Sequence, residues 1–192
     1  MNTLNPAELK DFLDAKVVQY NTPDFIGSDP LQIPHRYSSK EDIEISGFLT
    51  ATIAWGNRKS IINNANRLMK LMDDAPHDFV MHHQQKDLEV LNSFVHRTFN
   101  GTDCIQFMES LKHIYTHHKG LEGIFNSYAE ADSLQIAIHY LKQHFFEIDH
   151  LQRTQKHISD PLKTSAAKRI NMFLRWMIRP NDTHVDFGLW SQ

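Results

Sequence analysis

The chain has 192 residues, of which 41% are hydrophobic, and a formal net charge of −3. This length and composition fit a single domain, residues 1–192, with a sizeable core, and they exclude a disordered chain. The single cysteine, Cys104, cannot form an internal disulfide, and we find neither a signal peptide nor an apolar run of about 18 residues. We therefore expect a cytoplasmic protein that does not enter a membrane.

The N-terminal part of the sequence predicts three helices and one irregular loop. Asn5-Pro6-Ala7-Glu8 combines an N-cap residue with a proline and a glutamate at favoured positions, and it opens an amphipathic helix that ends near Tyr20. Three prolines and a glycine make residues 22–36 an ordered irregular loop. Helical spacing of apolar residues then predicts an antiparallel pair of helices over residues 41–73, joined by a tight turn after Trp55-Gly56.

The rest of the chain also predicts helices, and no segment alternates with period two over a useful length. Thr102 is the expected cap of the longest one. The fold class is therefore all-α. The predicted helices cover residues 76–83, 86–97, 102–118, 121–128, 133–146 and 165–178.

Positive charge is concentrated near the C-terminus. Residues 151–180 contain seven Lys or Arg against one acidic residue, a local net charge of +6 that leaves −9 for the remainder. This asymmetry is typical of an anion-binding site on an otherwise acidic protein, and its alternative is a solvated helix face. In the helix predicted at 165–178, apolar residues recur on one side and Lys168, Arg175 and Arg179 share the opposite side.

Lys168 lies in the first turn of this helix beside Arg169. The helix dipole and the neighbouring cation both favour a neutral amine at this position. A neutral lysine amine can attack a sugar C1′ and form a Schiff base, the step used by DNA glycosylases that also nick the strand. A phosphate-binding lysine and a purely solvated lysine are the alternatives.

The thirteen histidines raise the question of a metal site. His113 and His117 stand at i, i+4, and His118 is adjacent. A zinc site needs three or four ligands, and neither an acidic residue at the right offset nor a cysteine pair accompanies these histidines. We therefore predict structural or surface roles for them, and a helical metal protein is only the third interpretation.

Two segments carry a resemblance to a known superfamily. Residues 161–177 resemble the hairpin and following helix of the helix-hairpin-helix DNA glycosylases, particularly the 8-oxoguanine branch, in which the catalytic lysine opens that helix. Lys168 stands at the matching place. Residues 48–58 are similar to the helix-turn-helix of the same superfamily, whose turn residues wedge into the base stack. This similarity implies that Asn57 and Arg58 form the wedge.

A closer resemblance, over nearly the whole chain, is to an uncharacterised bacterial family distantly akin to those glycosylases. The motifs that carry it are Asp29-Pro30, Ile33-Pro34-His35-Arg36, Ile43-Glu44-Ile45, Trp55-Gly56-Asn57-Arg58, Lys168-Arg169, Phe173-Leu174-Arg175-Trp176-Met177 and Val185-Asp186-Phe187-Gly188-Leu189-Trp190.

The chain departs from these relatives in two ways. The superfamily hairpin has glycines that let backbone N–H groups approach a phosphate, whereas residues 160–165 contain none. Members of the closer family carry a further Leu-Asp-Thr-His type motif downstream. The chain ends at Gln192 before such a motif, which predicts a member truncated at its C-terminus.

These resemblances imply a DNA-binding protein of base-excision glycosylase and lyase type that acts on a flipped, damaged purine. Lys168 is the expected nucleophile, and Asp186 is the expected carboxylate that stabilises charge at C1′. Double-stranded DNA is the expected partner, no metal or organic cofactor is implied, and the oligomeric state is open. The expected phosphate contacts are Lys163, Arg169, Arg175 and Arg179.

The second interpretation is a non-catalytic nucleic-acid or protein interaction module that uses the same basic helix, residues 165–179. The two interpretations differ in the surroundings of Lys168. A nucleophile sits in a concave pocket near a carboxylate, whereas a simple contact residue lies on a convex surface.

Overall fold

The computed structural model describes residues 5–130 and 133–191. Helices account for 68% of the described residues, which confirms the all-α prediction. No helix among the described residues is long and apolar enough to cross a membrane. The α-helices are α1 Pro6–Tyr20, α2 Pro23–Ile26, α3 Lys40–Thr52, α4 Arg58–Leu71, α5 Pro76–His82, α6 Gln85–Leu88, α7 Gly101–His117, α8 Gly120–Tyr128, α9 Gln135–Phe145 and α10 Lys168–Ile178. Short 3-10 helices are η1 Pro30–Gln32, η2 Pro34–Arg36, η3 Glu89–Ser93, η4 Gln152–His157 and η5 Pro161–Lys163.

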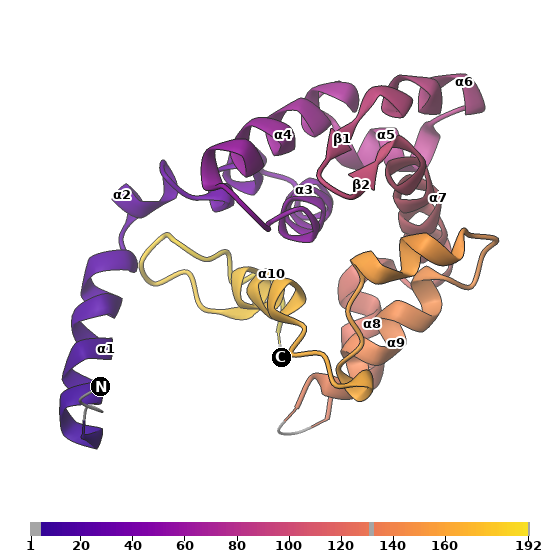
Figure 1. Ribbon diagram of the computed structural model, residues 1–192. Coiled ribbons are helices and arrows are strands. Elements are labelled where there is room, and N and C mark those ends of the chain that lie inside the picture. Colours follow the sequence, from indigo (N-terminus) through magenta and orange to yellow (C-terminus); the bar gives the residue numbers. More distant parts are fainter. Residues whose placement is uncertain (1–4, 131–132, 192) are drawn as a thin grey trace.

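Helix α3 lies inside the body of the molecule, with α4, α5, α10 and η2 packed around it (Figure 1). All its residues from 43 to 52 are buried, so it lacks the polar face of an ordinary surface helix. At Gly47 the two helices are in direct contact, since a Cβ atom there would lie at ordinary van der Waals distance, 3.4 Å, from Met177 Cε on α10.

The centre of the core is aromatic. The Phe48 ring on α3 lies 6.2 Å from Phe107 on α7, 5.8 Å from Phe145 on α9 and 5.6 Å from Phe173 on α10, measured between ring centroids. Aromatic pairs at such separations add about 0.5–1.5 kcal/mol each beyond the area they bury. Four helices that are distant in sequence therefore meet at one residue.

A buried carboxylate attaches the C-terminal segment to this core. Glu44 is 2% exposed, and its two oxygens accept hydrogen bonds from Trp190 Nε1 at 2.7 Å and from the Tyr115 hydroxyl at 2.6 Å. Burial raises the pKa of the Glu44 carboxyl, although these two hydrogen bonds and Lys40 oppose the shift. Trp190 also lies 5.3 Å from the Phe125 ring.

The helix predicted over residues 86–97 is wrong in its second half. Here α6 and η3 are followed by a small antiparallel hairpin, the only strands among the described residues, formed by β1 Val95–His96 and β2 Phe99–Asn100. Arg97 in its turn has a φ of 56°. The N-cap of α7 lies two residues earlier than expected, because Asn100, and not Thr102, forms the capping box with Asp103.

Three further predictions concern helix α1, the angle between α3 and α4, and the first residue of α10. Helix α1 has the predicted bounds and capping box, but none of its residues is buried, and it extends away from the body (Figure 1). Helices α3 and α4 cross steeply instead of lying antiparallel, since α3 is seen nearly end-on in Figure 1 while α4 runs across the view. Helix α10 begins at Lys168, not at 165, because Ala167 is left-handed with a φ of 44°.

Residues of η4 take part in a buried polar network with α7, beside the β1–β2 hairpin. Asp103 is fully buried and accepts a hydrogen bond from Thr154 Oγ1 at 2.8 Å, while Arg153 Nη1 lies 3.1 Å away. His157 Nε2 is 3.3 Å from Asp103 Oδ2 but is not aligned for a hydrogen bond. Burial lowers the pKa of His157, and the nearby Asp103 carboxylate only partly opposes this shift.

This shift predicts loss of stability in mild acid. A lowered histidine pKa means that the unfolded chain binds more protons, so stability falls as the pH drops below the ordinary value of 6.5. We expect His157→Phe, which keeps a ring but cannot take a proton, to show a smaller fall in Tm between about pH 7.5 and 5.5 than the unaltered protein. The exposed His82→Gln variant should behave like the unaltered protein. An equal fall in Tm for all three proteins would contradict this account.

Candidate functional site

A groove of about 670 Å³ opens between α1 and the C-terminal end of α10. Helix α2 and the start of α4 complete its walls. Four of its side chains are cationic and two are aromatic. The lining residues are Leu13, Lys16, Val17, Tyr20, Asn21, Phe25, Arg58, Arg175 and Arg179.

Two cations flank a pair of aromatic rings on the wall formed by α1, α2 and α4. Lys16 Nζ lies 5.7 Å from the centroid of the Tyr20 ring, and the Arg58 guanidinium lies 5.8 Å from the Phe25 ring. Tyr20 and Phe25 meet edge to face at 5.4 Å. Such a surface offers charge to phosphates and ring faces to unstacked bases.

The opposite wall is held by one buried carboxylate. Asp186 is 1% exposed; Arg175 donates to its Oδ1 from Nη2 at 2.9 Å and from Nε at 3.1 Å. Arg179 Nη1 lies 3.5 Å from the other oxygen of Asp186. The side chains of Arg175 and Arg179 remain 45% and 40% exposed. Asp186 therefore orients both arginines at the groove while offsetting only part of their charge.

The predicted nucleophile and the predicted carboxylate are at different ends of α10. Lys168 is the first residue of the helix and is exposed, and no carboxylate within the described ranges forms an ion pair with it. Asp186 is bound to Arg175, which is seven residues further along α10, or roughly 10 Å along the helix axis. The structure brings Asp186 to the expected phosphate contacts and not to Lys168.

Arg169, expected to contact phosphate, points into the protein. Its guanidinium donates to the backbone oxygens of Thr52 and His157 and lies 4.8 Å from the centroid of the Trp55 ring. Burial lowers the pKa of Arg169. This residue joins the start of α10 to the end of α3 and to Trp55, which follows α3.

The two expected wedge residues have different surroundings. The Asn57 side chain is the N-cap of α4, because its Oδ1 accepts a hydrogen bond from the Ser60 N–H at 3.2 Å. Arg58 is exposed and lines the groove. Lys163, the remaining expected phosphate contact, is exposed on η5, which packs against α9 away from the groove lining.

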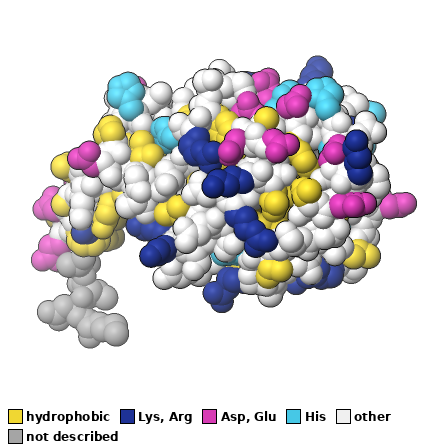
Figure 2. All heavy atoms as spheres, turned by 90° about the horizontal axis from the view of Figure 1, so that it is seen from above, with side chains coloured by type: hydrophobic (Ala, Val, Ile, Leu, Met, Phe, Trp, Pro, Cys, Tyr) yellow, Lys and Arg dark blue, Asp and Glu magenta, His cyan; other side chains and the backbone are white. Residues whose placement is uncertain are grey.

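The basic segment 151–180 therefore does not form one continuous patch. Arg153 pairs with Asp103, Arg169 points inward, and only Arg175 and Arg179 reach the groove. On the face shown in Figure 2, Lys and Arg side chains likewise lie among acidic, histidine and apolar ones. The net charge counted along residues 151–180 therefore overstates the positive charge that this segment brings to the groove.

Sequence reasoning missed the contribution of the N-terminal helices to the groove. Lys16, Tyr20 and Phe25 come from α1 and α2. A signal was present, because Phe12, Lys16 and Tyr20 recur at i, i+4, and the Lys16 ammonium contacts both rings. Their meeting with α10 was not visible in the sequence.

The cap made by Asn57 has a measurable consequence. We expect Asn57→Ala to lower the free energy of unfolding in urea by about 1 kcal/mol, because the Ser60 N–H loses its partner. Asn57→Asp keeps an acceptor at the N-cap and should retain most of this stability. If the two variants are destabilised equally, Asn57 does not act as a cap.

Comparison with protein families matches residues 29–192 to a family described as "Protein of unknown function (DUF2400)". No curated protein and no solved structure matches the chain. The matched range includes Arg58, Arg175, Arg179 and Asp186, whereas α1 and α2 precede it.

Proposed function

The chain belongs to the DUF2400 family of proteins of unknown function, and we propose that it binds double-stranded DNA in the groove between α1 and α10. The combination of four cations with two aromatic rings in this groove carries the proposal. Lys16, Arg58, Arg175 and Arg179 contact phosphates, and each contact releases condensed counterions.

The aromatic rings favour DNA in which one base has left the stack. A ring that stacks on a displaced base contributes about 1–3 kcal/mol, which helps to offset the few kcal/mol that unstacking costs. Tyr20 is 46% exposed and is thus available for such a contact. In this proposal Asp186 is a positioning residue that aims Arg175 and Arg179.

The proposed fold type is that of the helix-hairpin-helix glycosylases. Two features support it. The contact of Arg169 with Trp55 sets the turn 55–58 beside the start of α10, as wedge and nucleophile require. In the segment before α10, Thr164 and Ala167 have φ values of 65° and 44°. A left-handed conformation costs a non-glycine residue about 1–2 kcal/mol, so it persists only where the surrounding structure requires it. In this proposal, the shape of the hairpin before α10 is that requirement.

A second candidate function is lyase chemistry at Lys168, which is exposed as the first residue of α10 and is therefore open to DNA. No carboxylate of the described residues pairs with it, which is the arrangement expected of a contact residue in the non-catalytic module. The neutral amine would attack C1′ of an abasic or damaged nucleotide while the bond from C1′ to the departing hydroxyl or base breaks, and the departing group would take the electron pair and one amine proton. The nitrogen lone pair would then break the bond from C1′ to the ring oxygen, which takes the second amine proton and leaves an imine. Asp186 takes no part in this step, because it is bound to Arg175.

Salt dependence tests DNA binding. With four cations on phosphates, the logarithm of the association constant for a duplex oligonucleotide should fall against the logarithm of salt concentration with a slope of about −3 to −4. We expect the double variant Lys16→Ala/Arg58→Ala to reduce the magnitude of this slope by about 2, as measured by fluorescence anisotropy.

A matched control exists on the same two helices. Lys10 and Lys59 are exposed, lie on α1 and α4, and do not line the groove. The double variant Lys10→Ala/Lys59→Ala should keep the slope of the unaltered protein. Equal slopes for the two double variants, or an affinity that does not depend on salt, would reject the groove as the DNA site.

Borohydride trapping tests the lyase. After incubation with a duplex that contains an abasic site, reduction should trap a covalent adduct that Lys168→Gln abolishes and Lys163→Gln retains. Asp186→Asn should weaken DNA binding, since it releases Arg175 and Arg179. Absence of an adduct with the unaltered protein would leave a non-catalytic DNA-binding module.

A further inference from the structure

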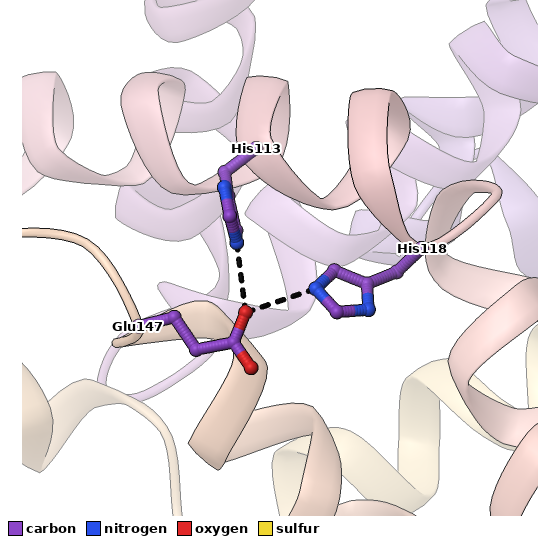
Figure 3. Close-up of side chains that lie close together, drawn as sticks. All are labelled: His113, His118 and Glu147. Carbon is purple, nitrogen blue, oxygen red and sulfur yellow. Dashed lines mark hydrogen bonds and ion pairs between the residues drawn. The ribbon is translucent and has the colours of Figure 1, made fainter.

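A cluster of histidines lies where two helices end. His113 is in the last turns of α7, and His118 is the C-cap of that helix. Glu147 follows the end of α9. In Figure 3, both histidine rings point at the same carboxylate oxygen of Glu147, at 2.8 Å from His113 Nε2 and 2.9 Å from His118 Nε2.

The three ligand atoms have the spacing of a metal site. They lie within 4.8 Å of one another. Around a zinc ion with bonds of about 2.0–2.2 Å, neighbouring ligand atoms of a tetrahedron are roughly 3.3 Å apart. Small rotations of these side chains, all of which are partly exposed, suffice to admit an ion.

The electrostatics of the cluster favour a cation. Three histidine side chains, His113, His118 and His144, surround the Glu147 carboxylate within hydrogen-bonding distance. The C-terminal ends of α7 and α9 also meet here, and each carries a partial negative charge.

A fourth residue, His144, contacts the other oxygen of the Glu147 carboxylate. His144 Nδ1 lies 2.5 Å from Glu147 Oε1, and its Nε2 lies 3.1 Å from the Tyr128 hydroxyl. The His144 ring thus connects the Glu147 carboxylate to the Tyr128 hydroxyl. Such outer partners fix the orientation of ligating side chains.

We propose that His113, His118 and Glu147 bind a divalent transition-metal ion, with zinc as the best match to two imidazoles and one carboxylate. Three protein ligands leave one coordination position open, as in zinc sites that bind a water or a substrate. A hollow of about 170 Å³, lined in part by His118, Ser127 and Tyr128, borders the cluster and provides room for a small ligand. None of these residues lines the DNA groove.

Zinc titration of tag-free protein, stripped with a chelator, tests the site. Calorimetry should give one ion per chain. At free zinc a hundred times Kd, Tm should rise by about 5–10 °C. We expect His118→Gln and Glu147→Gln each to weaken binding by about 100-fold or more, and His144→Phe by about 10–100-fold.

The control is His82→Gln, because His82 and Asp78 form an exposed pair that offers only two ligands. This variant should bind zinc like the unaltered protein. Unchanged affinity in His118→Gln and Glu147→Gln would overturn the proposal, as would absence of a one-to-one complex with the unaltered protein. Should either variant fail to fold, visible absorption of the Co²⁺-loaded unaltered protein decides: tetrahedral bands are expected, and their absence rejects the site.

Discussion

The burial of α3 on every side is the constraint on which the rest of the structure depends. A helix with no exposed face needs partners all around it, and these come from α4, α5, α10 and η2. Its central ring, Phe48, packs against aromatic rings from three of the other helices, α7, α9 and α10. Because α10 packs directly on α3, the position of the α10 wall of the proposed DNA groove follows from this core.

Electrostatic pairing decides what the basic segment can do. Seven basic residues lie within residues 151–180 of the sequence, but the fold separates them and gives them different partners. Arg153 and Arg169 stabilise the interior, while Asp186 keeps Arg175 and Arg179 at the groove. A buried carboxylate with two arginines is costly to break, since removal of one partner leaves an uncompensated charge. The same pairing explains why Asp186 is not beside Lys168.

The two proposed sites use different kinds of helix environment. The DNA groove relies on exposed cations and rings from α1, α2, α4 and α10. The histidine cluster relies instead on the convergence of two helix C-termini, where backbone carbonyls and Glu147 attract positive charge. The two sites share no residue, so one can be altered without changing the other. Their separation makes each proposal independently testable.

The sequence by itself determined the features that depend on neighbours within one helical turn. It fixed the all-α class, the capping box of α1 and the apolar side of α10, because these arise from spacings of three and four residues. Tertiary structure alone decided that α1 remains exposed, that Asp186 meets Arg175, and that Glu147 completes the pair His113 and His118. These contacts join residues from different elements, so they depend on how the helices pack around α3 and not on any local pattern.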